Sequence, residues 1–209
     1  MGYTTDFSGS LRIEPPLHPA QVAYINAFAN TRRLGRDPKV VMAYAKGADG
    51  RLVSDQIPDE VEHLAHLINE LGYDVKLSKR LLDWKKLDPA EVYGKYGEFY
   101  VGDNDRLGVI DYNCAPGQKS YGDKVEDGQP GLYCKWWIND DGELEWNGEE
   151  KFYDYLEWLQ YLIDHFFTEW GVLLNGEIEW QGEEMGDRGK IVVENNVMDA
   201  YEVTYKKRN

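Results

Sequence analysis

The sequence predicts an α+β fold, in which an antiparallel sheet carries one long amphipathic helix, about 148–170, on one face. Within residues 147–171, NGEEKFYDYLEWLQYLIDHFFTEWG, apolar side chains recur at steps of three and four, which is typical of a helix. From Gly97 onward, apolar and polar residues instead alternate in short runs bounded by turn residues, which is typical of strands.

Both ends of the long helix carry end signals. Asn147 stands at an N-cap position with Glu150 three residues later, which is the spacing of a capping box. Gly171 supplies the permissive residue after the last turn. The apolar stripe between them is Phe152, Leu156, Leu159, Ile163, Phe166, Phe167 and Trp170. A face this aromatic needs a large apolar partner, which we expect the sheet to provide.

Strands are predicted on both sides of this helix. In the second half they are 98–103, 106–113, 132–139, 143–147, 172–182, 190–195 and a last one around 201–205. The turn residues at 139–142, NDDG, predict a tight hairpin. Residues 11–17 also alternate but end at a Pro pair, so we expect a short strand at the sheet edge.

The first half contributes the extra N-terminal helices of the predicted fold. Pro19 opens one helix, and Asp37-Pro38 restarts the pattern for a second, shorter one. Residues 57–72 form a third, because Pro58 opens it, acids fill its first turn and Gly72 ends it. Weaker helical patterns lie around 79–86 and from residue 88 onward.

Length and charge define the organisation that we expect. A chain of 209 residues suits one domain, 1–209. Residues 1–96 form a mainly helical part with 13 basic and 13 acidic residues, and 97–209 form an acidic sheet-plus-helix part. The net charge of −15 therefore lies entirely in the second part.

Composition favours a cytoplasmic protein without a membrane span. No apolar run of about 18 residues is present, and the N-terminus lacks the basic and apolar regions of a secretory signal. The chain has only two cysteines, Cys114 and Cys134, and it is long enough to fold without a disulfide, so we expect reduced thiols.

The acidic segment 139–187 contains 15 acidic residues and a single base, Lys151. One interpretation is a solvated face kept for solubility. The other is a field that attracts a partner protein with a basic surface. Direct nucleic-acid binding by this half is excluded on either interpretation, because neutralising phosphates requires clustered Lys and Arg.

No catalytic residue, metal ion or cofactor is predicted. His63 and His66 are three residues apart, without the four-residue spacing and intervening Glu of a zinc protease. Asp103-Asn104-Asp105 begins like a calcium loop, but its fifth and twelfth positions lack oxygen ligands. Neither Cys114 nor Cys134 has a sequence-adjacent His that would activate a thiol. The motifs therefore disfavour an enzyme.

The candidate protein-binding site combines aromatic and acidic residues, because Trp and Tyr ringed by charge are typical of binding hot spots. It consists of Trp146, Glu177, Glu179, Trp180, Glu183, Glu184 and Asp187. The competing interpretation is that these aromatics form a second buried layer under the N-terminal helices. A second candidate function, a small enzyme or ligand-binding protein, would use Asp111, Tyr112, Asn113 and Cys114 beside the long loop 115–131. A third is a subunit that assembles with itself.

Three runs carry a resemblance to a known family. They are residues 2–34, GYTTDFSGSLRIEPPLHPAQVAYINAFANTRRL; the run from DYN (111–113) through GQPGLYCKWWINDDGELEW to residue 183; and GDRGKIVVENN, 186–196. The chain resembles an uncharacterised family of small acidic proteins found in bacteriophages, plasmids and bacterial genomes. Residues 37–96 and part of the 115–130 loop depart from the pattern. The resemblance implies a cytoplasmic protein of mobile elements, and it supplies no catalytic residues. By analogy, binding and disabling a host or defence component is a common role of such proteins.

Overall fold

The computed structural model describes residues 2–45, 90, 93–102, 105–118 and 128–202. The chain divides into two compact units, one made of 1–17 with 135–209 and the other of 18–134. We call them the sheet unit and the loop unit. Their borders lie at 17/18 and 134/135. The helices predicted at 57–72 and 79–86 lie outside the described residues.

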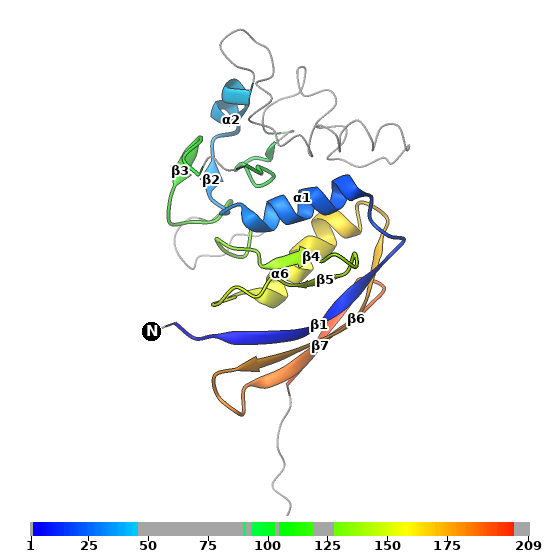
Figure 1. Ribbon diagram of the computed structural model, residues 1–209. Coiled ribbons are helices and arrows are strands. Elements are labelled where there is room, and N and C mark those ends of the chain that lie inside the picture. The colour runs from blue at the N-terminus through cyan, green and yellow to red at the C-terminus, as the bar shows by residue number, and fades with distance from the viewer. Residues whose placement is uncertain (1, 46–89, 91–92, 103–104, 119–127, 203–209) are drawn as a thin grey trace, which may run out of the picture. The chain divides into compact units, whose positions relative to one another are not determined.

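A six-stranded antiparallel sheet forms the frame of the sheet unit, in the order β4-β5-β1-β6-β7-β8 (Figure 1). Its strands are β1 Thr5–Glu14, β4 Trp136–Ile138, β5 Leu144–Trp146, β6 Leu173–Gly182, β7 Arg188–Glu194 and β8 Val197–Glu202. Together with its helices, this sheet confirms the α+β class with an antiparallel sheet.

β1 lies in the middle of the sheet, so its predicted place at an edge is wrong. It pairs with β6 along its whole length, from Thr5 opposite Gly182 to Glu14 opposite Leu173, and with β5 on its other side. Gly9 permits the close approach to β6, because its φ is 98° and an added Cβ would lie 2.6 Å from the Glu177 carbonyl oxygen. The sequence indicates this strand only from residue 11 onward.

The long helix predicted at 148–170 is also wrong in its bounds. The α-helix α6 spans Tyr155–Leu162 and continues as one π-helical stretch, η1, over Ile163–Phe167. Lys151 and Asp154 have positive φ angles of 61° and 54°, so the chain before Tyr155 is not helical. Asn147 accepts a hydrogen bond from the Glu149 N–H in a local turn instead of capping the helix.

An aromatic cluster between this helix and the inner face of the sheet explains the late helix start. Phe152 packs edge-on against Trp136 at 5.2 Å between ring centroids, and Phe7 lies 4.9 Å from Tyr155. The Trp136 indole N–H also donates to the Tyr155 carbonyl at 2.9 Å. Phe152 joins this cluster from irregular chain, between Lys151 and Asp154 with their positive φ angles, and the helix begins after it.

The loop unit contains α1 Pro19–Asn30, α2 Pro38–Ala45 and a two-stranded ladder of β2 Gly35–Arg36 with β3 Val109–Asp111. The starts of α1 and α2 confirm the helix openings predicted at Pro19 and Pro38. The strand predicted at 98–103 is wrong for its described residues, 98–102, which form turns and irregular chain. The strand predicted at 106–113 is confirmed only over the three residues of β3.

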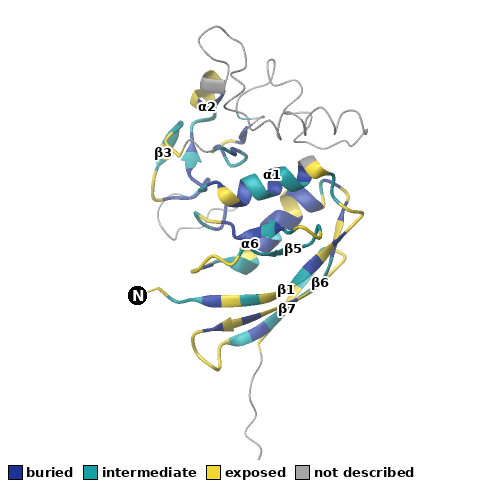
Figure 2. Cartoon of the chain, in the orientation of Figure 1, coloured by how far each residue is buried: buried dark blue, intermediate teal, exposed yellow. Residues whose placement is uncertain are grey.

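Two buried arginines organise this irregular chain. Arg33 donates to the Tyr100 carbonyl at 2.7 Å and to the Glu98 carbonyl at 2.5 Å, and its guanidinium lies 3.9 Å from the Phe28 ring centroid. Arg36 donates to the Leu107 carbonyl at 2.5 Å. Desolvation by burial lowers the pKa of Arg36. Figure 2 shows how buried and exposed residues follow one another along both units.

Candidate protein-binding site

The outer face of the sheet carries the acidic residues that the sequence singles out. On β6, Glu177 and Glu179 are exposed, whereas Ile178 is fully buried and Trp180 is only 6% exposed. Successive side chains of a strand point to opposite faces, so this pattern separates an acidic outer face from an apolar inner one.

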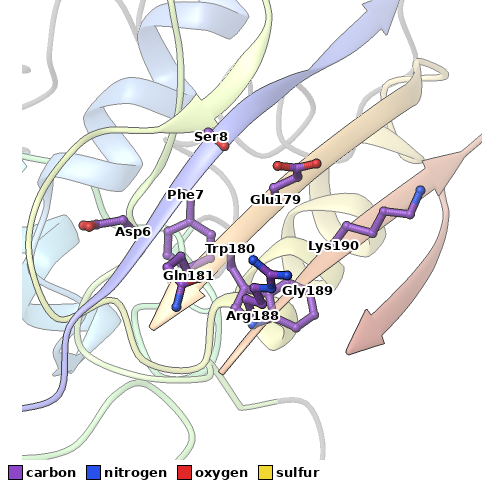
Figure 3. Close-up of a pocket in the computed structure, with 9 residues that line it drawn as sticks. All are labelled: Asp6, Phe7, Ser8, Glu179, Trp180, Gln181, Arg188, Gly189 and Lys190. Carbon is purple, nitrogen blue, oxygen red and sulfur yellow. The ribbon is translucent and has the colours of Figure 1, made fainter. Parts of the chain in front are cut away.

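The register extends this face across three strands. Glu179 stands between Ser8 of β1 and Lys190 of β7, and Gln181 stands between Asp6 and Arg188 in the next row. These six residues line a cavity of about 440 Å³. Phe7, Trp180 and Gly189, which alternate with them along the three strands, complete its lining. Figure 3 shows the nine residues on the three neighbouring strands.

The turn between β6 and β7 holds the other three predicted acids, and the N-terminal segment fixes their positions. The Thr4 N–H donates to the Glu183 carboxylate at 2.8 Å, and the Tyr3 hydroxyl donates to Asp187 at 2.5 Å. The hydrogen bond to Asp187 is the main cause of the raised pKa of Tyr3. Glu184 is exposed, and Met185 beside it is 88% exposed. The β6–β7 turn is therefore held in a defined position while its side chains stay exposed to solvent.

The electrostatics of the sheet unit are strongly acidic. By sequence it holds 20 Asp and Glu against 8 Lys and Arg, which accounts for −12 of the chain's −15. Lys190 neutralises part of the outer face, because its ammonium lies 3.0 Å from the Glu177 carboxylate. Both partners are about half exposed, so solvent screens this pair. We call Glu177, Glu179, Glu183, Glu184 and Asp187 the acidic surface.

The two tryptophans of the predicted site do not belong to the acidic surface. Trp180 points to the inner face, where its ring lies 6.0 Å from Tyr155. A Cβ on Gly189, its partner on β7, would lie 2.3 Å from the Trp180 ring, so the indole covers this glycine. Trp146 is half-buried, with its ring 5.6 Å from Phe7 and its indole N–H donating to the Glu149 carbonyl. Trp180 is therefore buried and Trp146 half-buried, so neither presents a fully exposed ring beside the carboxylates.

The alternative ligand site at 111–114 is split by exposure. Tyr112 is 49% exposed and Asn113 is exposed, whereas Cys114 is only 4% exposed. The Asp111 carboxylate accepts the Asn113 N–H at 2.7 Å, which closes a local turn. These four residues are neighbours in the chain, but their side chains do not share one environment.

Several residues of the outer face are missed by sequence reasoning. Asp6 and Ser8 belong to the part of β1 that the sequence does not indicate, and Tyr201, 51% exposed, follows Lys190 in its cross-strand row. The alternation of polar residues at 6, 8 and 10 is a signal that could have indicated this part of the strand. Only the pairing with β6, far away in sequence, places these residues beside Glu179.

Among the described residues, no three His, Cys, Asp or Glu side chains gather as they would around a metal ion. His63, His66, Asp103 and Asn104, which the sequence raises as metal candidates, lie outside the described residues. None of the described helices is long and apolar enough to cross a bilayer.

Comparison with protein-family models, with curated proteins and with solved structures finds no match for this chain.

Proposed function

We propose that this chain is a non-enzymatic binding protein whose acidic surface docks on a basic surface of a bacterial protein. One observation carries the proposal: β6 and the turn after it present five carboxylates on one exposed stretch of a unit with net charge −12. Complementary charge steers encounter and fixes the register of a complex more than it adds affinity.

The aromatic contribution differs from the one that the sequence suggests. With Trp146 and Trp180 turned toward the interior, apolar contacts would come from Met185 on the turn and Tyr201 on β8, which are both exposed. Met and Tyr are enriched in interface cores. A partner would thus meet carboxylates with apolar side chains among them.

The resemblance of residues 2–34 and 98–197 to proteins of bacteriophages and plasmids suggests the setting. In the cytoplasm of a bacterial host, basic protein surfaces commonly bind nucleic acid, and an acidic protein that occupies such a surface inhibits by competing with it. We therefore propose a host or defence protein as the target. The acidic segment 139–187 has a single base, Lys151, so it lacks the clustered Lys and Arg of a nucleic-acid-binding surface.

The test compares two variants with the same change in net charge. Glu179→Lys with Glu184→Lys reverses two exposed carboxylates of the acidic surface, and Asp140→Lys with Asp141→Lys reverses two exposed carboxylates in the β4–β5 turn. Each immobilised protein is incubated with bacterial lysate at about 0.05 M and about 0.5 M salt, where the screening length falls to a few ångströms. Bound proteins are quantified by mass spectrometry.

We expect one stoichiometric, nucleic-acid-binding partner that the unmodified chain and the Asp140/Asp141 variant retain at low salt. The Glu179/Glu184 variant should lose it, and high salt should release it. Equal retention by both variants would contradict the proposal. The alternative of self-assembly predicts a mass above one chain in size exclusion that survives high salt, because apolar association is not screened. The small-ligand alternative at 111–114 predicts no protein partner at either salt.

A further inference from the structure

The strand β8 is an edge of the six-stranded sheet, with β7 as its one neighbour among the described strands. Five of its six residues, including Val197 and Tyr201, are exposed. At the opposite edge, β4 has only three residues, and Trp136 and Ile138 are both buried. An open strand edge of six residues is a template on which another chain can pair.

The turn before β8 determines which backbone groups face the open edge. Asn195 and Asn196 have φ angles of 50° and 68°, the signature of a two-residue type I′ turn. In such a hairpin the flanking residues, Glu194 and Val197, exchange both their backbone hydrogen bonds, and bonded pairs recur at every second residue. Residues 197, 199 and 201 thus bond to β7, and the N–H and C=O groups of Met198, Ala200 and Glu202 point outward.

The start of β8 is held firmly. The Asn196 side chain accepts the Leu174 N–H at 2.7 Å and donates to the Val172 carbonyl at 2.8 Å. The Asn175 side chain accepts the Asn195 N–H at 2.9 Å. These bonds tie the β7–β8 turn to the beginning of β6, so the edge is preorganised and an incoming strand pays little to order it.

Charge decides which chain fits this edge. Asp199 and Glu202 are exposed on β8, and the sheet unit carries −12 in total. A second copy would bring the same acidic edge and the same net charge, so like charges oppose self-pairing. A positively charged segment meets complementary charge instead. Its apolar residues would lie beside Val197 and Tyr201.

We propose that β8 accepts an extended, positively charged segment of the partner protein as a seventh strand of the sheet. This inference rests on the proposed function and assigns its main-chain contact. The acidic surface attracts the partner, and the outward groups of Met198, Ala200 and Glu202 form the ladder that holds one segment of it.

The decisive variant is Ala200→Pro. It removes one outward N–H, leaves every β7–β8 hydrogen bond in place and puts proline where edge strands tolerate it. Ala200→Thr is the matched control, because it keeps the N–H and favours a strand. The probe is a fluorescent eight-residue peptide of alternating Val and Lys, and its affinity is measured by fluorescence polarisation. Amide hydrogen exchange is followed with and without this peptide.

We expect Ala200→Pro to weaken peptide binding at least tenfold and Ala200→Thr to change it less than twofold. Peptide binding should slow exchange at residues 198, 200 and 202 and leave 197, 199 and 201 unchanged. If Ala200→Pro fails to fold, Asp199→Lys is used instead. It should lower the affinity for the Val–Lys peptide and raise the affinity for a Val–Glu peptide.

Failure of this inference is distinguishable from failure of the proposed function. If Glu179/Glu184 reversal abolishes capture of the lysate partner but Ala200→Pro has no effect on it or on the peptide, the acidic surface binds without strand addition. Peptide-induced protection elsewhere than at 198–202, absence of peptide binding, or dimerisation of the chain through β8 would each overturn the inference.

Discussion

The sheet unit and the loop unit reach stable structures by different means. In the sheet unit, backbone ladders satisfy the main chain, and aromatic side chains such as Trp136 fill the inner face. In the loop unit, long side chains supply hydrogen bonds to the main chain. Arg33 and Gln129, both 1% exposed, each donate to the Glu98 carbonyl. Irregular chain can be buried as completely as a sheet, provided that side chains supply the hydrogen bonds that strand pairing supplies in the sheet.

The consequence is a difference in how each unit fails. A sheet distributes its hydrogen bonds over many backbone pairs, so one side chain matters mainly through the volume that it fills. Buried irregular chain concentrates its hydrogen bonds on a few side chains, so one substitution leaves several polar groups without partners.

The largest effect is expected in the aromatic core. Trp136→Ala removes a fully buried indole that contacts Phe7 and Phe152, and it should lower the free energy of unfolding by about 3–5 kcal/mol. Urea unfolding followed by circular dichroism measures this loss. Trp137→Ala is the control, because its side chain points to the other face and is half-exposed. Equal losses for the two variants would contradict the core assignment.

A slightly smaller loss, confined to the loop unit, is expected from Arg33→Gln. The shorter amide cannot reach both the Glu98 and Tyr100 carbonyls, and losing these hydrogen bonds from a charged donor should cost about 2–4 kcal/mol, although Gln129 still donates to the Glu98 carbonyl. Amide hydrogen exchange should speed up in residues 93–102 and remain unchanged in β6 and β7. Arg32→Gln, at a half-buried neighbour that donates to the Tyr112 carbonyl at 3.1 Å, should cost less, about 1 kcal/mol. Faster exchange throughout the sheet unit would show that the two units are not independent.

Alkaline pH should weaken the loop unit. Burial raises the pKa of Tyr93 from its ordinary 10.0 to about 12. Because the folded state favours the neutral phenol, this stability is complete below pH 10 and is lost as the pH rises toward 12. The loss amounts to about 2–3 kcal/mol. Urea midpoints at pH 8 and pH 11 measure about half of this loss, roughly 1.4 kcal/mol, because pH 11 lies midway between the two pKa values. Tyr93→Phe should flatten the difference. An unchanged pH dependence in that variant would assign the titration to another group.

The smallest effect is expected on the acidic surface. Lys190→Gln breaks the exposed ion pair with Glu177 and should change the free energy of unfolding by less than about 1 kcal/mol. It should strengthen capture of the basic partner, because it makes the outer face more acidic. Arg12→Gln, which breaks the comparable exposed pair with Glu14 near the other end of β1, serves as the control for stability. A large loss of stability would contradict the view that this face is kept for binding.

Much of the local structure was predictable from the sequence. The alternation in 172–182 and 190–195 predicts β6 and most of β7, and Pro19 and Pro38 mark the starts of α1 and α2. These signals are local, because the period of a strand and the φ of proline do not depend on distant residues. The same alternation identifies Glu177 and Glu179 as neighbours on one face.

Residue patterns alone thus predict the α+β class, the acidic charge of the second half and the carboxylates of β6. Long-range packing places β1 in the middle of the sheet, turns Trp180 inward over Gly189 and delays the start of α6 to Tyr155. Each of these depends on a partner far away in the sequence. A pattern within one segment fixes which side chains share a face, whereas packing against another segment fixes which face is buried.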